Sequence, residues 1–316
     1  MPDNHTHINY KEIIKNNPWI VSKNKSCVLS PDVDGLLCGL IMSSFLDWNI
    51  VGYYDGKNLT IENNIDPKNV IYLDMEILRK NVLSIGHHMN SHDIGHAPDG
   101  FNLVMNNCVN PNYIRKFDRS HSFARKYPLG TVHLLMYILE NQYPGMIKIN
   151  KEGLASLFFA DGVWKILFKY TSNVLDWFDY LHSESEADWW SKLKTLSVIE
   201  LIEEIEHLLI EFKKLNATGK NWYGHFDPEE YSAEKNKIDE LIVYFSDKTG
   251  WMYKKKNWEI HNPKHFSFIK KIYGQNNSGS KSNQKFAEIW NENPLSLAMT
   301  DGSTIQYTVD PENIFT

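Results

Sequence analysis

The sequence predicts an α/β protein: a parallel sheet with flanking helices, a helical connector, and a second, smaller α+β domain. In the first half, short apolar runs alternate with helical patterns at spacings of about 15 to 30 residues, as in βαβ units. A long stretch with apolar residues three and four apart follows, and the remainder is richer in Lys, Asn, Tyr and Trp. We therefore expect a first domain at residues 1–185, a connector at 186–224 and a small domain at 225–316.

Five short apolar runs in the first half are expected to be strands. In chain order they are Cys27–Ser30, Val51–Tyr54, Val70–Leu73, Val82–Ile85 and Asn102–Met105. Helices are expected at Leu36–Trp48, Tyr127–Leu139 and Lys151–Tyr170. Because Leu36–Trp48 is apolar nearly all round, that helix should be buried.

The second half is expected to begin with a long helix and to end with a hairpin. Asp188–Leu215 has the longest helical periodicity, and Asn216–Gly219 supplies a stop signal. Gln275–Asn283 has the composition of a loop. Leu295–Met299 and Thr304–Val309 flank an Asp-Gly pair, which favours a β-hairpin.

Composition excludes several classes of protein. Of the 316 residues, 42% are hydrophobic and 23% charged, which is typical of globular chains and not of disordered or fibrous ones. A net charge of −6 argues against coating duplex DNA by charge alone, although a local basic groove is compatible with it. Three cysteines without a Cys-x-x-Cys pair exclude a disulfide scaffold and a zinc ribbon. With no signal peptide at Met1–Asn4 and no long apolar stretch, we expect a soluble, cytoplasmic protein without a membrane partner.

Acidic and histidine side chains gather at the expected carboxyl ends of the strands. Asp32 and Asp34 follow the first strand, Asp74 ends the third, and His87 and His88 follow the fourth. Ligands bind beyond these ends in open parallel sheets, so the five side chains should converge. Converging carboxylates repel one another unless a cation lies between them. Oxygen ligands with an imidazole suit Mn²⁺ or Mg²⁺.

Each of these features also has a simpler interpretation. An Asp-x-Asp-Gly segment is commonly a turn, and a His-His pair after a strand is commonly a surface feature. Asp74 could instead cap a helix that continues through Met75–Leu78. The order and placement of the features together favour the metal site.

Taken in order, the motifs resemble those of the DHH phosphoesterase superfamily. An aspartate pair with glycine, a strand ending in aspartate, and a histidine pair are similar to the first three motifs; they lie at Ser30–Gly35, Val70–Asp74 and Ile85–His88. The segments that resemble the Val-Asn-Pro-Asn run of RecJ-type exonucleases, the small-residue segment and the fourth motif lie at Cys108–Asn112, Tyr127–Thr131 and Gly153–Asp161. The resemblance covers residues 25–165 with every motif in order.

The resemblance implies a RecJ-like exonuclease, a hydrolase that cleaves single-stranded DNA, RNA or short oligonucleotides. It implies two divalent cations, Mn²⁺ first and Mg²⁺ as the alternative, which activate a water molecule. The implied ligands are Asp32, Asp34, Asp74, His87 and Asp161. Asp74 would bridge the ions, and His88 would contact the scissile phosphate or support the nucleophile.

Two departures from the family pattern bear on activity. Gly86 replaces the first aspartate of the Asp-His-His signature, which in the family supports the histidines, so the signature is a degenerate Gly-His-His. Asp93, a few residues further on, is the candidate replacement. The C-terminal half also lacks the family's Gly-Gly-His-like substrate motif, for which Gly274–Ser280 is the nearest candidate.

A basic stretch at Arg115–Lys126 offers candidates for substrate binding. Arg119, His121 and Arg125 could hold substrate phosphates, and a solvated loop with ordinary surface charge is the alternative.

Two other functions remain open at this stage. One is a hydrolase of small cyclic or linear dinucleotides that uses the same metals. The other is a catalytically inactive, DHH-like nucleic-acid-binding or scaffold protein, for which Gly86 is the argument. The five retained ligand candidates argue against the inactive protein, because converging polar groups without a metal are costly. Val28 stands where the inorganic pyrophosphatase branch has a histidine, which disfavours that branch.

Overall fold

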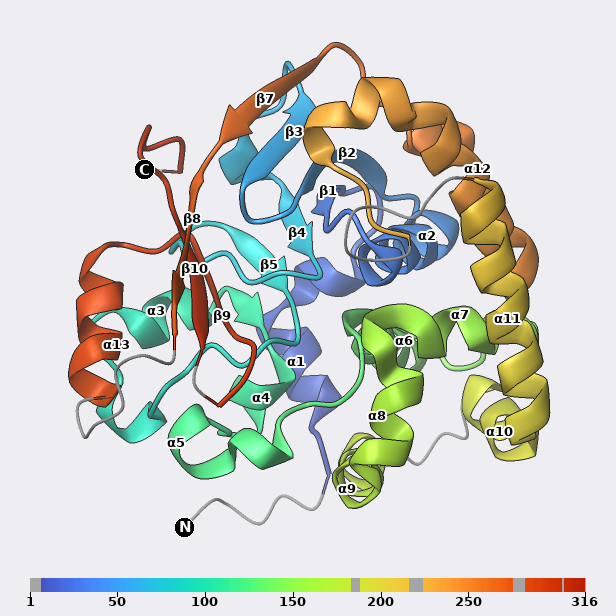
Figure 1. The fold of residues 1–316 in the computed structure, drawn as a ribbon, viewed down its shortest axis with the longest axis horizontal. Coiled ribbons are helices and arrows are strands. Elements are labelled where there is room, and N and C mark those ends of the chain that lie inside the picture. The colour runs from blue at the N-terminus through green and yellow to red at the C-terminus, as the bar shows by residue number, and fades with distance from the viewer. Residues whose placement is uncertain (1–6, 183–187, 216–223, 275–281, 303, 316) are drawn as a thin grey trace.

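A seven-stranded, mostly parallel sheet lies at the centre of the molecule (Figure 1). The structure is a computed structural model that describes residues 7–182, 188–215, 224–274, 282–302 and 304–315. The strand order is β6-β5-β4-β1-β2-β3-β7. The five parallel strands are β1 (Ser26–Leu29), β2 (Asn49–Tyr54), β4 (Ile71–Leu73), β5 (Leu83–Ile85) and β6 (Cys108–Val109). β3 (Asn58–Glu62) pairs antiparallel with both β2 and β7 (Pro263–Ser267).

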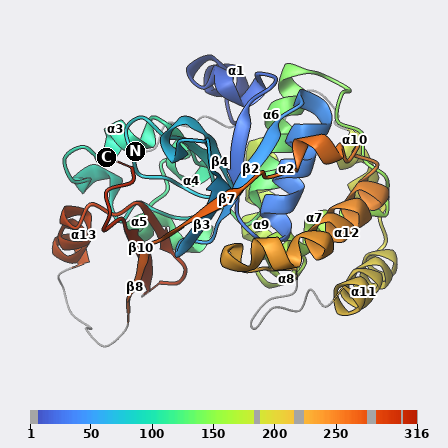
Figure 2. The same cartoon turned by 90° about the horizontal axis from the view of Figure 1, so that it is seen from above.

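Helices cover one face of this sheet (Figure 2). The layer contains α1 (Tyr10–Asn16), α2 (Val33–Leu46), α6 (Thr131–Gln142), α7 (Gly153–Phe159) and α12 (Tyr231–Thr249). Every residue of α2 from Val33 to Ser43 is buried, as its apolar sequence predicts. Residues of the opposite face, among them Val28 and Tyr72, pack against Phe268, Leu295 and Phe315 from the C-terminal part of the chain. The helical face is therefore covered mainly by the first half of the sequence, with α12 from the second half, and the other face by C-terminal residues.

The remaining helices are shorter or lie at the periphery. They are α3 (Phe101–Met105), α4 (Pro111–Ile114), α5 (Arg119–Ser122), α8 (Val163–Lys169), α9 (Thr171–Leu181), α10 (Asp188–Thr195), α11 (Val198–Lys214) and α13 (Ser282–Asn291). The stretch expected to form one helix at 188–215 is two helices, because Ser197 and Glu200 form a capping box that starts α11. The stretch at 151–170 is likewise interrupted, at residues 160–162.

A separate three-stranded antiparallel sheet contains β8 (Ile269–Tyr273), β10 (Ile305–Val309) and β9 (Ser296–Met299), in that order. The pairing of β9 with β10 confirms the predicted hairpin. The border between the two sheets lies at Phe268, between β7 and β8. Of the region expected to form the small domain, 225–316, α12 and β7 pack with the large sheet and its helices. The domain boundaries stay a prediction.

One predicted strand is wrong, and one alternative interpretation is excluded. The run Asn102–Met105 is not a strand but part of α3, because Phe101 and Met105, four residues apart, are buried while Leu103 is 57% exposed. The strand of that region is β6. Met75–Leu78 is not helical either; it is an irregular segment in which Met75 N donates to Ile85 O. Asp74 therefore caps no helix there.

Among the described residues, no helix combines the length and the apolar character that crossing a bilayer requires. The helix stop expected at Asn216–Gly219 and residues 275–281 of the expected loop lie outside the part of the chain that the structure describes.

Candidate metal centre

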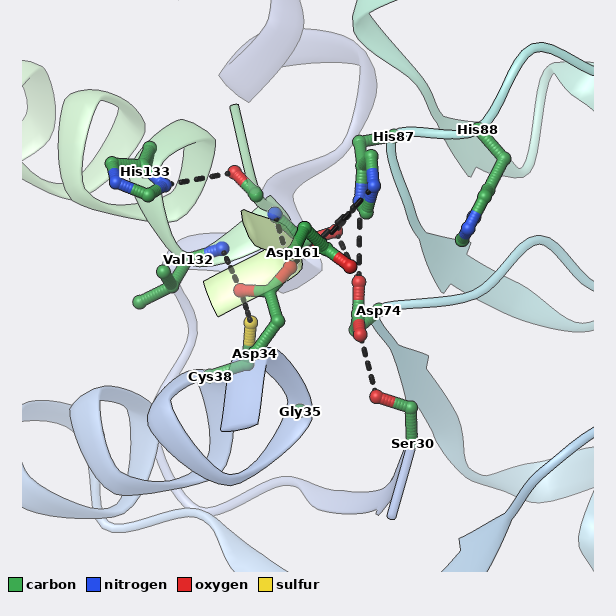
Figure 3. A network of polar contacts seen from close by, with 12 residues as sticks. Ser30, Asp34, Gly35, Cys38, Asp74, His87, His88, Val132, His133 and Asp161 are labelled. Carbon is green, nitrogen blue, oxygen red and sulfur yellow. Dashed lines mark hydrogen bonds and ion pairs between the residues drawn. The ribbon is translucent and has the colours of Figure 1, made fainter. Parts of the chain in front are cut away.

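Four side chains that can ligate a metal converge at the carboxyl edge of the parallel strands (Figure 3). Asp34 comes from the first turn of α2, Asp74 directly follows β4, His87 follows β5, and Asp161 lies between α7 and α8. One ligand atom from each lies within 4.8 Å of the others. Because β1, β4 and β5 are adjacent and parallel, the segments that leave them meet at this edge. We call these four residues the central group.

His87 lies between the three carboxylates. Its Nδ1 is 3.3 Å from Asp74 Oδ1 and 3.8 Å from Asp34 Oδ2, and its Nε2 is 3.3 Å from Asp161 Oδ2. Burial alone would lower the pKa of His87, but the charges of Asp161 and Asp74 raise it to about 9. The protonated ring thus supplies positive charge among the carboxylates.

The side chains of the central group differ in their exposure to solvent. The side chains of Asp34 and Asp74 are 0% and 3% exposed, that of His87 is 11% exposed, and that of Asp161 is 31% exposed. Asp34 and Asp74 therefore form the floor of the site, and Asp161 forms its solvent-facing side.

Asp34 is held by the N-terminus of α6. Its carboxylate accepts hydrogen bonds from Thr131 N at 2.6 Å and Val132 N at 2.9 Å. The close approach requires Gly130, since a Cβ there would lie 2.8 Å from Asp34 Oδ2. A helix N-terminus favours an anion, yet burial and then the carboxylates of Asp74 and Asp161 raise the pKa of Asp34 well above its usual value.

Asp74 is held by two hydroxyl groups. Ser30 Oγ donates to its Oδ2 at 2.5 Å, and Thr131 Oγ1 donates to its Oδ1 at 2.7 Å. Burial would raise the pKa of Asp74, but the hydrogen bond and the charge of His87 lower it below its usual value. Ser30 and Thr131 lie in the motifs at Ser30–Gly35 and Tyr127–Thr131, but no pattern in the sequence distinguishes them as partners of Asp74.

Two members of the central group have a left-handed backbone. Asp74 has φ +65° and Asp161 has φ +50°. Residues other than glycine adopt this region uncommonly, and such strain is concentrated at functional sites. In both residues the strained backbone carries a side chain of the central group.

The donor set fits a hard divalent cation. A carboxylate has about four lone-pair positions, and the hydrogen bonds to Asp34 and Asp74 use only some of them. Three carboxylates and one imidazole suit Mn²⁺. Mg²⁺ also binds carboxylates but takes oxygen ligands in preference to nitrogen. A cation here would also offset the repulsion that raises the pKa of Asp34.

Asp32 lies beside the central group without belonging to it. Its Oδ1 accepts hydrogen bonds from Ser30 Oγ at 2.9 Å and from Gly35 N at 3.0 Å, so it caps α2. The Ser30 hydroxyl joins it to Asp74. Burial, Asp74 and Asp161 raise the pKa of Asp32 to about 7. The structure thus places this predicted ligand next to the central group. Asp32 both caps α2 and lies near Asp74.

His88 lies next to His87 but contacts a residue that the sequence analysis missed. The two imidazole rings stack with centroids 4.4 Å apart, and His88 Nδ1 is 3.3 Å from Glu76 Oε2. The predicted support, Asp93, does not take this place: it accepts from Gly95 N and pairs with His96. Met75 and Ile77, on either side of Glu76, pack in the same apolar cluster, so the polar residue between two apolar ones was the available signal.

The three predicted phosphate-binding residues make their contacts elsewhere. Arg119 donates to Gly302 O, His121 Nδ1 lies 3.0 Å from Asp118 Oδ1, and Arg125 lies 3.4 Å from Asp176. The structure does not bring them into the central group, and their role in binding substrate stays a prediction.

Comparison of the chain with protein-family models, with curated protein sequences and with solved structures gave no match.

Proposed function

We propose that the chain is a divalent-cation-dependent phosphodiesterase that hydrolyses single-stranded nucleic acid or short oligonucleotides. Mn²⁺ is the metal we expect, and Mg²⁺ is the alternative. The observation that supports this most is the convergence of Asp34, Asp74, His87 and Asp161 from four separate elements at the carboxyl edge of a parallel sheet. Asp32, beside them, is the fifth proposed ligand.

The chain's own residues fix the donors before a ligand arrives. Thr131 and Val132 orient Asp34, and Ser30 and Thr131 orient Asp74. Divalent cations in such a site supply Lewis acidity, which makes water a better nucleophile at neutral pH and offsets charge on the phosphoryl group. Preorganised donors of this kind reduce the reorganisation that catalysis requires.

His88 is the proposed contact to the scissile phosphate. Its side chain is 38% exposed, whereas its neighbour His87 is 11% exposed. Because Nδ1 of His88 faces Glu76, Nε2 is the ring nitrogen left to donate a hydrogen bond to a phosphate oxygen.

Incubation with Mn²⁺ and end-labelled single-stranded DNA, RNA or dinucleotides tests the proposal. We expect a ladder of products from one end of the DNA or RNA, and no products from Asp74→Ala. The matched control is Asp47→Ala, since Asp47 also has a left-handed backbone (φ +54°) but caps α2 at its far end and pairs with Lys254. The control should retain activity.

Other outcomes would change the proposal. Cleavage of dinucleotides alone would replace the substrate with a small nucleotide. Binding of nucleic acid without hydrolysis, with Mn²⁺ present, would favour the inactive binding protein. Full activity of Asp74→Ala would show that the site is wrong.

A further inference from the structure

A glutamate fills the space that a side chain at position 86 would occupy. A Cβ built on Gly86 would lie 2.4 Å from Oε1 and 2.6 Å from Cδ of Glu76. A side chain at position 86 would therefore overlap the carboxyl group of Glu76. Gly86 does not have a left-handed backbone, so its conformation alone would accept another residue. The carboxylate of Glu76 therefore lies directly beside the position that the Cβ of residue 86 would take.

The backbone directs Glu76 to this place. Met75 N donates to Ile85 O at 3.1 Å, and Ile77 N donates to Ser84 Oγ at 3.1 Å. These bonds hold the irregular segment after β4 along β5. The residue between them, Glu76, consequently points across β5 to the start of the histidine pair.

The contacts of Glu76 all lead to His88. Glu76 Oε1 accepts hydrogen bonds from His88 N at 2.9 Å and from Asn110 Nδ2 at 2.7 Å, and Oε2 faces His88 Nδ1 at 3.3 Å. Asn110 also donates to His88 O at 2.8 Å. The Glu76 side chain is 3% exposed. A buried carboxylate that faces one ring nitrogen fixes the tautomer and the orientation of an imidazole.

We propose that Glu76 is a positioning residue for His88 and that it supplies, from the segment after β4, the carboxylate that an acidic residue at position 86 could otherwise supply. Where it concerns catalysis, this inference rests on the proposed phosphodiesterase function. It predicts that Gly86 does not mark an inactive site, because Glu76 already brings a carboxylate to His88 from the segment after β4.

A cycle of variants tests this inference: Glu76→Ala, Gly86→Asp and the double variant. Glu76→Ala should lower kcat about 10- to 100-fold with little change in KM, as partners that orient a metal-site histidine typically do. Gly86→Asp alone should be less stable and less active, because its side chain overlaps Glu76. The double variant should recover most of the lost kcat, although Met75 C, 2.9 Å from the new Cβ, must shift slightly.

Two further variants separate positioning from folding. Glu76→Gln keeps the size of the side chain and an acceptor for His88 N and Asn110, but removes the negative charge beside His88 Nδ1. It should fold normally and change the imidazole ¹⁵N chemical shifts of His88. Glu140→Ala is the matched control, since Glu140 is also buried and accepts from Gly145 N. It should leave the His88 signals unchanged.

The readouts distinguish failure of this inference from failure of the proposed function. If the wild-type chain hydrolyses no phosphodiester, the function fails, while the unfolding temperatures and the His88 signals of the same variants still test the role of Glu76. If the wild type is active and the double variant is no better than Glu76→Ala in any readout, the inference is wrong. Wild-type stability of Gly86→Asp would overturn it as well.

Discussion

Two groups of acidic and histidine side chains in this molecule have similar composition and different surroundings. One is the central group, and the other contains Asp93, Asp118 and His121, whose ligand atoms also lie within 4.8 Å of one another. In the second group Asp118 accepts hydrogen bonds from His121 N at 2.8 Å and Ile94 N at 3.1 Å, and Asp93 accepts from Gly95 N at 2.9 Å. Both aspartates cap short helices next to them in the chain.

In the central group, burial and then the neighbouring carboxylates raise the pKa of Asp34 well above its usual value. Asp34 also accepts two backbone N–H groups, but from a helix 97 positions further along the chain, and it lies against Asp74 and Asp161. In the second group Asp93 and Asp118 are also buried, but each accepts backbone N–H groups and pairs with an exposed histidine, His96 or His121. Acidic residues and a histidine that lie close together are thus a weak indication of a metal site. Buried carboxylates that repel one another are a stronger one.

The largest effect that follows from this comparison is on metal binding. Asp34→Asn should lower Mn²⁺ affinity by about 100-fold or more, because a charged ligand at the floor of the site becomes neutral. Asp118→Asn is a close match, since Asp118 is also buried and also accepts two backbone N–H groups. It should bind Mn²⁺ like the wild type. Titration calorimetry measures both, and equal affinity of the two variants would erase the distinction between the groups.

The next effect is a pH dependence that should belong to the central group and the adjacent Asp32, not to the second group. Burial opposes the protonation of His87, but Asp161 and Asp74 raise its pKa to about 9, so the metal must displace a proton at neutral pH. Mn²⁺ affinity should rise at least about tenfold for each pH unit between roughly pH 6 and roughly pH 8, and more steeply below pH 7, where Asp32 also releases a proton. His121→Ala should leave this slope unchanged, because His121 lies in the second group. A flat affinity over this range would contradict the role of His87.

The same ionisation predicts the opposite trend for the metal-free protein. His87 has a higher pKa folded than unfolded, so its stabilisation is complete below about pH 6.5 and is lost as the pH rises through about 9. The pKa of Asp32, raised to about 7 by burial and by Asp74 and Asp161, acts with the same sign over a lower range. In a chelator, the unfolding temperature should fall as pH rises, and Mn²⁺ should reverse the trend.

Strand ends were predictable from sequence where a buried run stops at a polar residue. β1, β4 and β5 begin and end within one residue of the predicted runs, which is why Asp34, Asp74 and His87 could be placed at one edge. Asp161 was identified only through the resemblance to a family motif, since nothing local in the sequence distinguishes it. That these residues bind metal stays a prediction.

What the sequence could not reveal depends on contacts between distant segments. Glu76 acquires its place only because the segment after β4 is bound to β5, and Thr131 acquires its place because α6 starts against α2. β7 joins the large sheet from more than two hundred positions away by pairing with β3. The spacing of apolar residues along the chain does not indicate such pairings. At Asn102–Met105 it gave the wrong element, because so short a run fits the repeat of a strand and that of a helix equally well.

The smallest effect on the proposed chemistry should come from Asp118→Ala, which affects stability instead. Removing the carboxylate takes away the cap of α5 and leaves His121 N and Ile94 N, both half-buried, without their acceptor, at a cost of about 0.5–2 kcal/mol in the free energy of unfolding. Urea denaturation measures this loss. Mn²⁺ affinity should stay within twofold of the wild type, because the cap lies in the second group and its oxygens are used by backbone donors. A stable Asp118→Ala protein with impaired Mn²⁺ binding would show that the second group, and not only the central one, holds metal.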